Sequence, residues 1–477
     1  MRASVLNSYL MPLQTKKTKI VATIGPATES PEMLTALVGA GMNVARLNLS
    51  HGDHAEHGAR IINVRKVAKE LGTPIAILFD LSGPKIRTGS YTTDRITIEA
   101  GQELILTSEE IVGDAHRFYV NYPKLPQEVK EGSVIMLDDG KKKLVVECVE
   151  GTEIHCRVVV GGELKSRRGV NVPGAYLSIS CITEKDLTDL AFAVKNDVDI
   201  IALSFVRRAD DVLQLKALLQ KAGKSIPVVV KIETQEAIDN MSEILAVADG
   251  AMVARGDLAV EVPAEQVPIL QKRIIREANT LGKPVITATQ MLESMIQSPV
   301  PTRAEVSDIA NAIFDGTDAV MLSEESTLGK YPVEAVQMMT RIAETVEASL
   351  PGSTMTAMSA VDTISTSCVE AAGHIGAAAI VTLTESGVSA QMIARFKPAC
   401  PIIALSPNQV TVERLTLSRG VYPFLADAGK TTDEVIAFVS KFLSENNLAK
   451  SGDHIVITAG LKFGVAGSTN MLCVITL

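Results

Sequence analysis

Short apolar runs recur along most of this chain and alternate with amphipathic stretches, and this alternation constrains the fold more than any other feature. Several runs are continuous in Val, Ile, Leu and Ala, which is typical of parallel strands buried on both faces. The stretches between them, such as 210–222 and 264–279, repeat apolar residues with helical spacing. Eight strand–helix units in this order predict an α/β fold with a (β/α)8 TIM barrel. The runs are 19–24, 43–49, 75–81, 199–206, 228–233, 251–257, 285–290 and 318–323.

The third strand–helix unit is interrupted by about a hundred residues of different character. Segments 95–99, 143–149 and 154–160 alternate in polarity or are β-branched, and Asp139-Gly140 is a hairpin signal between strands. Thr183 then precedes an acidic, helix-like segment and is a good N-cap. We therefore expect a small β domain inserted in the loop after the third strand.

The pattern changes again after residue 350, where a helix over 361–375 and strands over 379–383, 455–459 and 472–476 predict a separate α/β domain. The first 15 residues have no signal-peptide pattern and are interpreted as a ragged N-terminus, in which Met11 could be the initiator. The expected division is 1–15 N-terminus, 16–83 first part of the barrel, 84–181 inserted β domain, 182–350 second part of the barrel and 351–477 C-terminal domain.

Composition excludes several classes of partner. The 46 Lys and Arg against 55 Asp and Glu give a net charge of −9, which argues against nucleic acid or an anionic membrane as the main partner. No run approaches the roughly 18 apolar residues of a membrane span. The six cysteines show no Cys-x-x-Cys spacing, which favours free thiols in a reducing cytoplasm.

Polar side chains follow several of the predicted barrel strands at their C-terminal ends, where active sites of such barrels form. Lys231 and Glu233 end the fifth strand, and their spacing of two places them on one face. Asp257 ends the predicted sixth strand, so two carboxylates from adjacent strands could hold Mg²⁺. A lysine beside such a cation suits an oxyanion or a phosphoryl group in transfer. A structural ion pair of Lys231 with Glu233 is the alternative.

Seven segments in order resemble pyruvate kinases. They are KKTKIVATIGPAT (16–28), ARLNLSHG (45–52), DLSGPKIRT (80–88), VKIE (230–233), MVARGDL (252–258), ATQMLESM (288–295) and DGTDAVMLS (315–323). The resemblance implies a barrel with an inserted β lid and a C-terminal effector domain, in a cytoplasmic homotetramer. It also implies phosphoryl transfer from phosphoenolpyruvate to ADP, giving pyruvate and ATP with Mg²⁺ or Mn²⁺ as cofactor.

The resemblance further assigns expected roles to individual residues. Glu233 and Asp257 match the metal ligands, Lys231 the lysine that neutralises the moving phosphoryl group, and Arg46 a phosphate contact. Gly256, Asp257 and Thr289 match the pocket for the substrate carboxylate. The positions near the nucleotide are Asn48, Ser50, His51, Arg87 and Arg168, the last standing where family members often have Lys.

Two departures from the family concern a monovalent cation and an effector. Members that need K⁺ commonly have Thr and Glu where this chain has Leu81 and Lys85. Asn48, Ser50 and Asp80 could still line a pocket for K⁺, but Lys85 could bring the same charge. In the C-terminal domain, Thr384, Ser386, Gly387 and Ser389 open a helix and could form a phosphate nest near the glycine-rich loop 460–470. Glu385 there disfavours a sugar bisphosphate and leaves a monophosphate open.

Two other functions fit parts of the sequence. An Mg²⁺-dependent pyruvate-type aldolase would also pair Glu and Asp on adjacent strands, but it would not need the inserted lid or the basic pair Arg167-Arg168. A catalytically silent metabolite sensor would tolerate loss of Lys231, Glu233 or Asp257, and all three are present.

Overall fold

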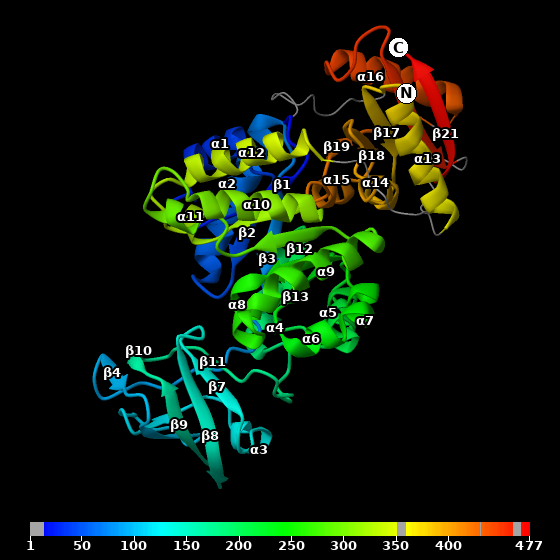
Figure 1. The fold of residues 1–477 in the computed structure, drawn as a ribbon. Coiled ribbons are helices and arrows are strands. Elements are labelled where there is room, and N and C mark those ends of the chain that lie inside the picture. The colour runs from blue at the N-terminus through cyan, green and yellow to red at the C-terminus, as the bar shows by residue number, and fades with distance from the viewer. Residues whose placement is uncertain (1–13, 351–358, 430, 461–468) are drawn as a thin grey trace.

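The computed structural model describes residues 14–350, 359–429, 431–460 and 469–477. Three bodies follow one another in space: a β lid lies at one end of a central α/β barrel, and the C-terminal domain lies at the other end (Figure 1). Two peptide segments join the lid to the barrel, because the lid is inserted between β3 (Ala76–Asp80) and α4 (Glu184–Lys195). The lid therefore covers the end of the barrel where strand β3 finishes.

The barrel is a closed sheet of parallel strands in the order β1-β16-β15-β14-β13-β12-β3-β2. Its strand residues are almost all buried, which explains why the runs are continuously apolar. Inside the barrel, Val21, Val44, Leu78, Met252 and Met321 belong to one buried apolar cluster. The remaining strands are β1 (Lys19–Thr23), β2 (Val44–Asn48), β12 (Ile200–Leu203), β13 (Val228–Ile232), β14 (Gly250–Ala254), β15 (Val285–Ala288) and β16 (Ala319–Leu322).

Helices surround this sheet and pack their apolar faces on it. The predicted N-cap Thr183 is confirmed: its side chain accepts a hydrogen bond from Asp186 N, within a capping box. The other helices of the barrel are α1 (Pro31–Ala40), α2 (His54–Leu71), α5 (Ala209–Lys221), α6 (Gln235–Asp239), α7 (Met241–Val247), α8 (Arg255–Glu261), α9 (Val267–Thr280), α10 (Arg303–Asp315), α11 (Glu324–Thr327) and α12 (Pro332–Glu347), with 3-10 turns η1 (Ala264–Gln266) and η2 (Glu293–Ile296).

The lid contains a six-stranded sheet in the order β11-β7-β8-β9-β5-β6 and a two-stranded sheet of β10 and β4. Asp139 and Gly140 lie in the turn between antiparallel β7 and β8, both with positive φ, so the predicted hairpin is confirmed. Its elements are β4 (Arg95–Ile98), β5 (Glu103–Thr107), β6 (Arg117–Tyr119), α3 (Leu125–Glu128), β7 (Val134–Leu137), β8 (Lys142–Glu150), β9 (Glu153–Val160), β10 (Gly162–Lys165) and β11 (Val170–Asn171).

The C-terminal domain is a five-stranded sheet in the order β19-β18-β17-β20-β21, in which β21 pairs antiparallel to β20. The predicted strand over 379–383 is confirmed at both of its ends. The elements are α13 (Ala360–His374), β17 (Ala379–Leu383), α14 (Val388–Ala394), β18 (Ile402–Ser406), α15 (Gln409–Leu415), β19 (Val421–Leu425), α16 (Thr432–Glu445), β20 (His454–Gly460) and β21 (Thr469–Thr476).

Buried polar contacts dock this domain on the N-terminal ends of the barrel strands. The Lys19 Nζ at the start of β1 donates to Val421 O over 2.7 Å and lies 4.5 Å from the centroid of the Tyr422 ring. Gly420 N donates to Lys17 O over 2.9 Å. The C-terminal domain is thus attached at the end of the barrel opposite to the lid. Among the described residues, none of the helices combines the length and the apolar character that crossing a membrane requires.

Candidate functional site

Lys231 is the centre of a buried polar network at the C-terminal ends of the barrel strands. Its Nζ lies 2.7 Å from Glu233 Oε1 and 3.5 Å from Asp80 Oδ1, and it donates to Ser204 Oγ over 2.8 Å. Burial by itself lowers the pKa of Lys231, but Asp80 and Glu233 raise it above the ordinary value of lysine. Lys231 is therefore a fixed positive charge, beside Glu233 as their spacing predicts.

Arg46 shares Asp80 with Lys231. The Arg46 guanidinium lies 2.6 Å from Asp80 Oδ2 through Nη2 and donates to Thr23 Oγ1 over 2.8 Å. Burial raises the pKa of Asp80, and the two cations more than offset this, so that its pKa falls below the usual value. One ionised carboxylate thus holds two cations side by side at the barrel mouth.

Glu233 has the features of a cation ligand. It is fully buried, one oxygen accepts Phe205 N over 2.8 Å, and Oε1 has no hydrogen bond of acceptable geometry within the described part of the chain. Burial raises the pKa of Glu233 to about 7 although Lys231 lowers it, so a second cation beside this carboxylate would favour its ionised form. Asp257 is the second carboxylate of this region, and it contributes to the same rise.

Two carboxylates fit a hexacoordinate Mg²⁺ whose remaining positions are filled by substrate and water oxygens. A divalent cation would therefore depend on bound substrate to complete its coordination.

The segment that carries Gly256 and Asp257 differs from the sequence-based prediction. Strand β14 ends at Ala254, and Arg255 already begins helix α8, so Asp257 lies in a first helical turn and not at a strand end. A Cβ at Gly256 would lie 2.9 Å from Thr289 Cγ2, which explains the glycine. Thr289 itself has a φ of 76°, an uncommon conformation for a β-branched residue. The backbone of α8 and the Thr289 side chain are thereby brought into close contact.

A cleft of about 440 Å³ runs between this barrel end and the lid. Its lining includes Asp257 from the barrel and four groups predicted to lie near the nucleotide or the cation, namely His51, Lys85, Arg87 and Arg168. Burial and the neighbouring cations Lys85 and Arg87 lower the pKa of His51. The lining also carries carboxylates, so the cleft combines basic groups that suit a polyphosphate with acidic groups that suit a cation.

Comparisons with known proteins agree with this geometry. Residues 15–336 match the family model described as the pyruvate kinase barrel domain, and residues 362–475 match that of the pyruvate kinase alpha/beta domain. The chain is 44% identical to the pyruvate kinase of Clostridium acetobutylicum, over 96% of this chain and 98% of that protein. It is 49% and 48% identical to the pyruvate kinases of Staphylococcus saprophyticus and Geobacillus stearothermophilus, over 96% of this chain and 80% of each relative.

The chain belongs to the pyruvate kinase family. It is accordingly a phosphotransferase of glycolysis, which excludes the aldolase and the silent sensor as its main function. Pyruvate kinases generally use Mg²⁺ and K⁺. The two matched regions leave residues 337–361 between them, at the junction of the barrel and the C-terminal domain.

The predicted pocket for a monovalent cation contains a lysine ammonium in this chain. Lys85 Nζ donates to Ser50 Oγ over 2.8 Å, and Asn48 Oδ1 accepts Ser50 N over 3.1 Å. Asn48 is the register partner of Asp80, so the two residues lie side by side on neighbouring strands. Leu81 is buried and offers no side-chain oxygen. Partial desolvation of its amino group, then the charge of Lys231, lowers the pKa of Lys85.

The predicted effector segment of this pyruvate kinase lies between β17 and α14. Thr384 Oγ1 accepts Gly387 N over 2.9 Å, Gly387 has a φ of 89°, and Ser389 Oγ contacts Thr469 Oγ1 at the start of β21. Ser386 lies on the same turn. Residues 461–468 of the glycine-rich loop are outside the described ranges.

Two functional contacts of this pyruvate kinase were missed from the sequence. Ser204, after β12, accepts from Lys231 and donates to Leu81 O over 2.7 Å. Arg255 donates to the backbone oxygens of Ala288 and Thr289 over 3.1 and 2.6 Å, and so fixes the strained turn at Thr289. Arg255 lies in the quoted segment 252–258, but nothing in its spacing indicates a partner 34 residues away.

Proposed function

We propose that the barrel mouth of this pyruvate kinase transfers the phosphoryl group of phosphoenolpyruvate to ADP, giving pyruvate and ATP. The observation that supports this most directly is the Lys231–Glu233 pair, in which Lys231 Nζ lies 2.7 Å from Oε1 of a fully buried carboxylate. This pair places the positive charge of Lys231 next to the proposed metal ligand Glu233. The test is ADP-dependent pyruvate formation from phosphoenolpyruvate by the purified protein, with GDP in place of ADP to measure nucleotide selectivity.

Lys231 and Arg46 bind the phosphoryl group in this proposal. Both cations are buried and already oriented by Asp80, so no side chain has to reorganise when negative charge shifts between the donor and acceptor oxygens. As the bond to the substrate oxygen breaks, Lys231 stabilises the enolate that remains. Binding by fixed charges of this kind is the main contribution a protein makes to phosphoryl transfer.

Glu233 and Asp257 would hold Mg²⁺, or Mn²⁺, which when bound supplies a Lewis acid for the phosphoryl and carboxylate oxygens of the substrate. The backbone at Gly256 and the hydroxyl of Thr289 orient the substrate carboxylate. A Cβ at Gly256 would lie 2.9 Å from Thr289 Cγ2, so the glycine allows the start of α8 and the Thr289 side chain to approach one anion together.

Asn48, Ser50, His51, Arg87 and Arg168 bind the nucleotide in this proposal. The last two lie at the hinge of the lid, where Arg87 bridges Gly169, so lid movement would bring them to the phosphates. Lys85 takes the place of K⁺: its ammonium is bound to Ser50, as a monovalent cation in that pocket would be.

Thr384, Ser386, Gly387 and Ser389 bind a phosphorylated monoanionic or dianionic effector in a cytoplasmic homotetramer. The turn that Gly387 N closes by donating to Thr384 Oγ1, and the hydroxyls of Ser386 and Ser389 beside it, support the nest. Calorimetry with sugar monophosphates and nucleoside monophosphates tests it, with Ser389→Ala as the variant. Light scattering at assay concentration tests the tetramer. Absence of binding by the whole set of phosphates would remove the nest.

A further inference from the structure

A second cavity lies at the end of the barrel opposite to the catalytic mouth. Its volume is about 630 Å³, and Pro227 and Pro284, which line it, directly precede strands β13 and β15. Met392 of α14 and Leu415 of α15 line the other wall. The cavity therefore lies between the N-terminal ends of the barrel strands and the C-terminal domain, a whole strand length from Lys231.

The charged groups of this cavity are mostly cations. Lys216, Lys224, Lys283 and Arg414 line it, against the single carboxylate Asp249. Asp197, outside the lining, pairs with Lys224 over 2.6 Å, so two positive charges remain in excess here, in contrast to the net charge of −9 of the chain. The acidic surface of the chain repels anions, whereas this basic cavity attracts them.

The carboxylate is already fully engaged. Asp249 Oδ2 lies 2.8 Å from Lys216 Nζ and also accepts Val228 N over 2.9 Å. Lys283 donates to two backbone carbonyls, those of Ala246 and Ala248, and is not paired with an acid within the described ranges. Lys224 Nζ lies 2.6 Å from Asp197 Oδ1, just outside the lining, so Lys283 and Arg414 are the lining cations without an acid partner within the described ranges.

Arg414 is the group that most clearly lacks a partner. Its guanidinium forms no hydrogen bond or ion pair with any part of the chain that the structure describes, and its Nε is buried. Burial lowers the pKa of Arg414, and the charges of Asp249 and Asp199 oppose this only in part. An unpaired, half-buried guanidinium is costly, unless a ligand satisfies it.

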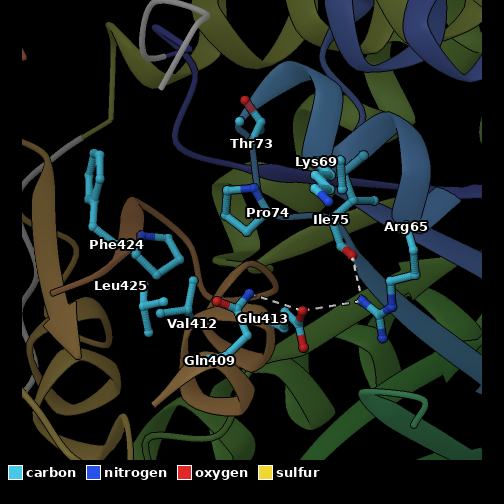
Figure 2. A pocket seen from close by; sticks show the side chains of 13 residues that line it. Arg65, Lys69, Thr73, Pro74, Ile75, Gln409, Val412, Glu413, Phe424 and Leu425 are labelled. Carbon is cyan, nitrogen blue, oxygen red and sulfur yellow. Dashed lines mark hydrogen bonds and ion pairs between the residues drawn. The ribbon is translucent and has the colours of Figure 1, made fainter. Parts of the chain in front are cut away.

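The neighbouring residue of α15 provides an internal comparison. Figure 2 shows the adjacent cleft, where Glu413 lies between Gln409 and Arg65. There Arg65 is 3.4 Å from Glu413 and 2.8 Å from Asp199, so its charge is balanced by two acids. The same short helix thus presents a paired charge to one cleft and an unpaired charge to the other. Of these two charges, that of Arg414 is the one that an anionic ligand would balance.

We infer that this cavity binds a phosphate monoester with an apolar or flat ring, held by Arg414 and Lys283 at the barrel–C-terminal domain junction. The apolar part of the lining, Leu219, Ile226, Leu281, Met392 and Leu415, would cover the ring. The phosphate would link a cation of α15 to a cation that precedes β15. The site is distinct from the nest at Thr384–Ser389, although Ser386 borders the cavity.

Equilibrium dialysis of the full-length protein with labelled adenosine monophosphate tests this site, because that probe joins a phosphate monoester to a flat ring. Wild type is expected to bind one equivalent of the probe per chain at this site. Arg414→Gln should bind the same equivalent with an affinity at least tenfold lower. Arg276→Gln is the matched control, since Arg276 is exposed on α9 and does not line the cavity. Arg414→Lys, which keeps the charge, should retain part of the binding.

Two further arms separate this site from the effector nest and from simple anion binding. Ser389→Ala should leave the Arg414-dependent equivalent in place, even if nest binding is lost. Inorganic phosphate should bind at least tenfold more weakly than the nucleotide. Equal binding by wild type and Arg414→Gln, equal loss in Arg276→Gln, or equal affinity for inorganic phosphate would each overturn the inference. If circular dichroism shows that Arg414→Gln is misfolded, Lys283→Gln provides the same test.

Discussion

Activity without added K⁺ is the expectation that depends most on a single substitution of this chain. The Lys85 ammonium is held by Ser50 at 2.8 Å, in a pocket that Asn48 and Asp80 also line. A K⁺ ion in the same pocket would lie within about 4 Å of it. At an effective dielectric of about 20, two unit charges at that separation repel by about 4 kcal/mol, or a factor of about 10³ in affinity. Lys85 should therefore exclude K⁺.

The assay compares pyruvate formation in sodium-only and potassium-only buffer at equal ionic strength. We expect the wild-type rate of pyruvate formation to differ by less than a factor of about two between the buffers, because a surface charge effect alone is small. Lys85→Glu should become strongly dependent on K⁺, since it exchanges the tethered cation for a carboxylate that attracts one. Lys85→Met is the control that removes the ammonium without adding an acid.

Two outcomes would refute the reasoning. A tenfold or greater activation of wild type by K⁺ would show that Lys85 does not occupy the cation pocket. A Lys85→Glu variant that is fully active in sodium-only buffer would show that no monovalent charge is needed there. Loss of activity in both Lys85 variants under both buffers would assign Lys85 to substrate binding, which the KM for phosphoenolpyruvate would then report.

Three further predictions concern the catalytic network and the domain junction. Lys231→Met should lower kcat by about 10²–10³-fold without a change in circular dichroism, because it removes the cation that faces the transferred phosphoryl group; near-normal turnover would exclude this role. Glu233→Gln and Asp257→Asn should each raise the Mg²⁺ concentration for half-maximal activity, since each removes one anionic ligand; unchanged Mg²⁺ saturation would exclude that residue. Burial lowers the pKa of Lys397 from 10.5 to about 8, so the unfolded chain binds more protons than the folded one between these values and stability should rise with pH there. Lys397→Met should then change the free energy of unfolding more favourably at pH 7 than at pH 10, by about 2–3 kcal/mol; equal changes in denaturant titrations at both pH values would contradict a buried charge.

The sequence alone predicts the parts of this structure that follow from local periodicity. The strand over 379–383 and the N-cap at Thr183 are confirmed because apolar continuity and capping act within a few residues. The side-by-side position of Lys231 and Glu233 follows from the two-residue repeat of a strand. All three predictions need no knowledge of the rest of the chain.

Contacts between distant segments could not be predicted in this way. The predicted end of the sixth barrel strand at Asp257 was wrong, because helix α8 already begins at Arg255. The polarity of Arg255 does not distinguish a strand end from a helix start. The close approach of Gly256 to Thr289, a distant residue, is not visible in the local sequence. The pairing of Arg46 with Asp80 depends on the register of β2 and β3, in which Asn48 faces Asp80. A shift of one residue would turn these side chains to the other face of the sheet.

The shared carboxylate Asp80 explains how two cations and a buried acid can coexist at the barrel mouth. Arg46 and Lys231 would repel each other strongly in a buried site, yet each lies within 3.5 Å of an Asp80 oxygen. Asp80 therefore offsets the repulsion between the two cations in the folded protein, before substrate binds. A phosphoryl group then enters a field that is already oriented, so its binding requires little rearrangement of the protein. It follows that loss of Asp80 should harm phosphate binding more than loss of either cation alone, because it releases both cations from their positions.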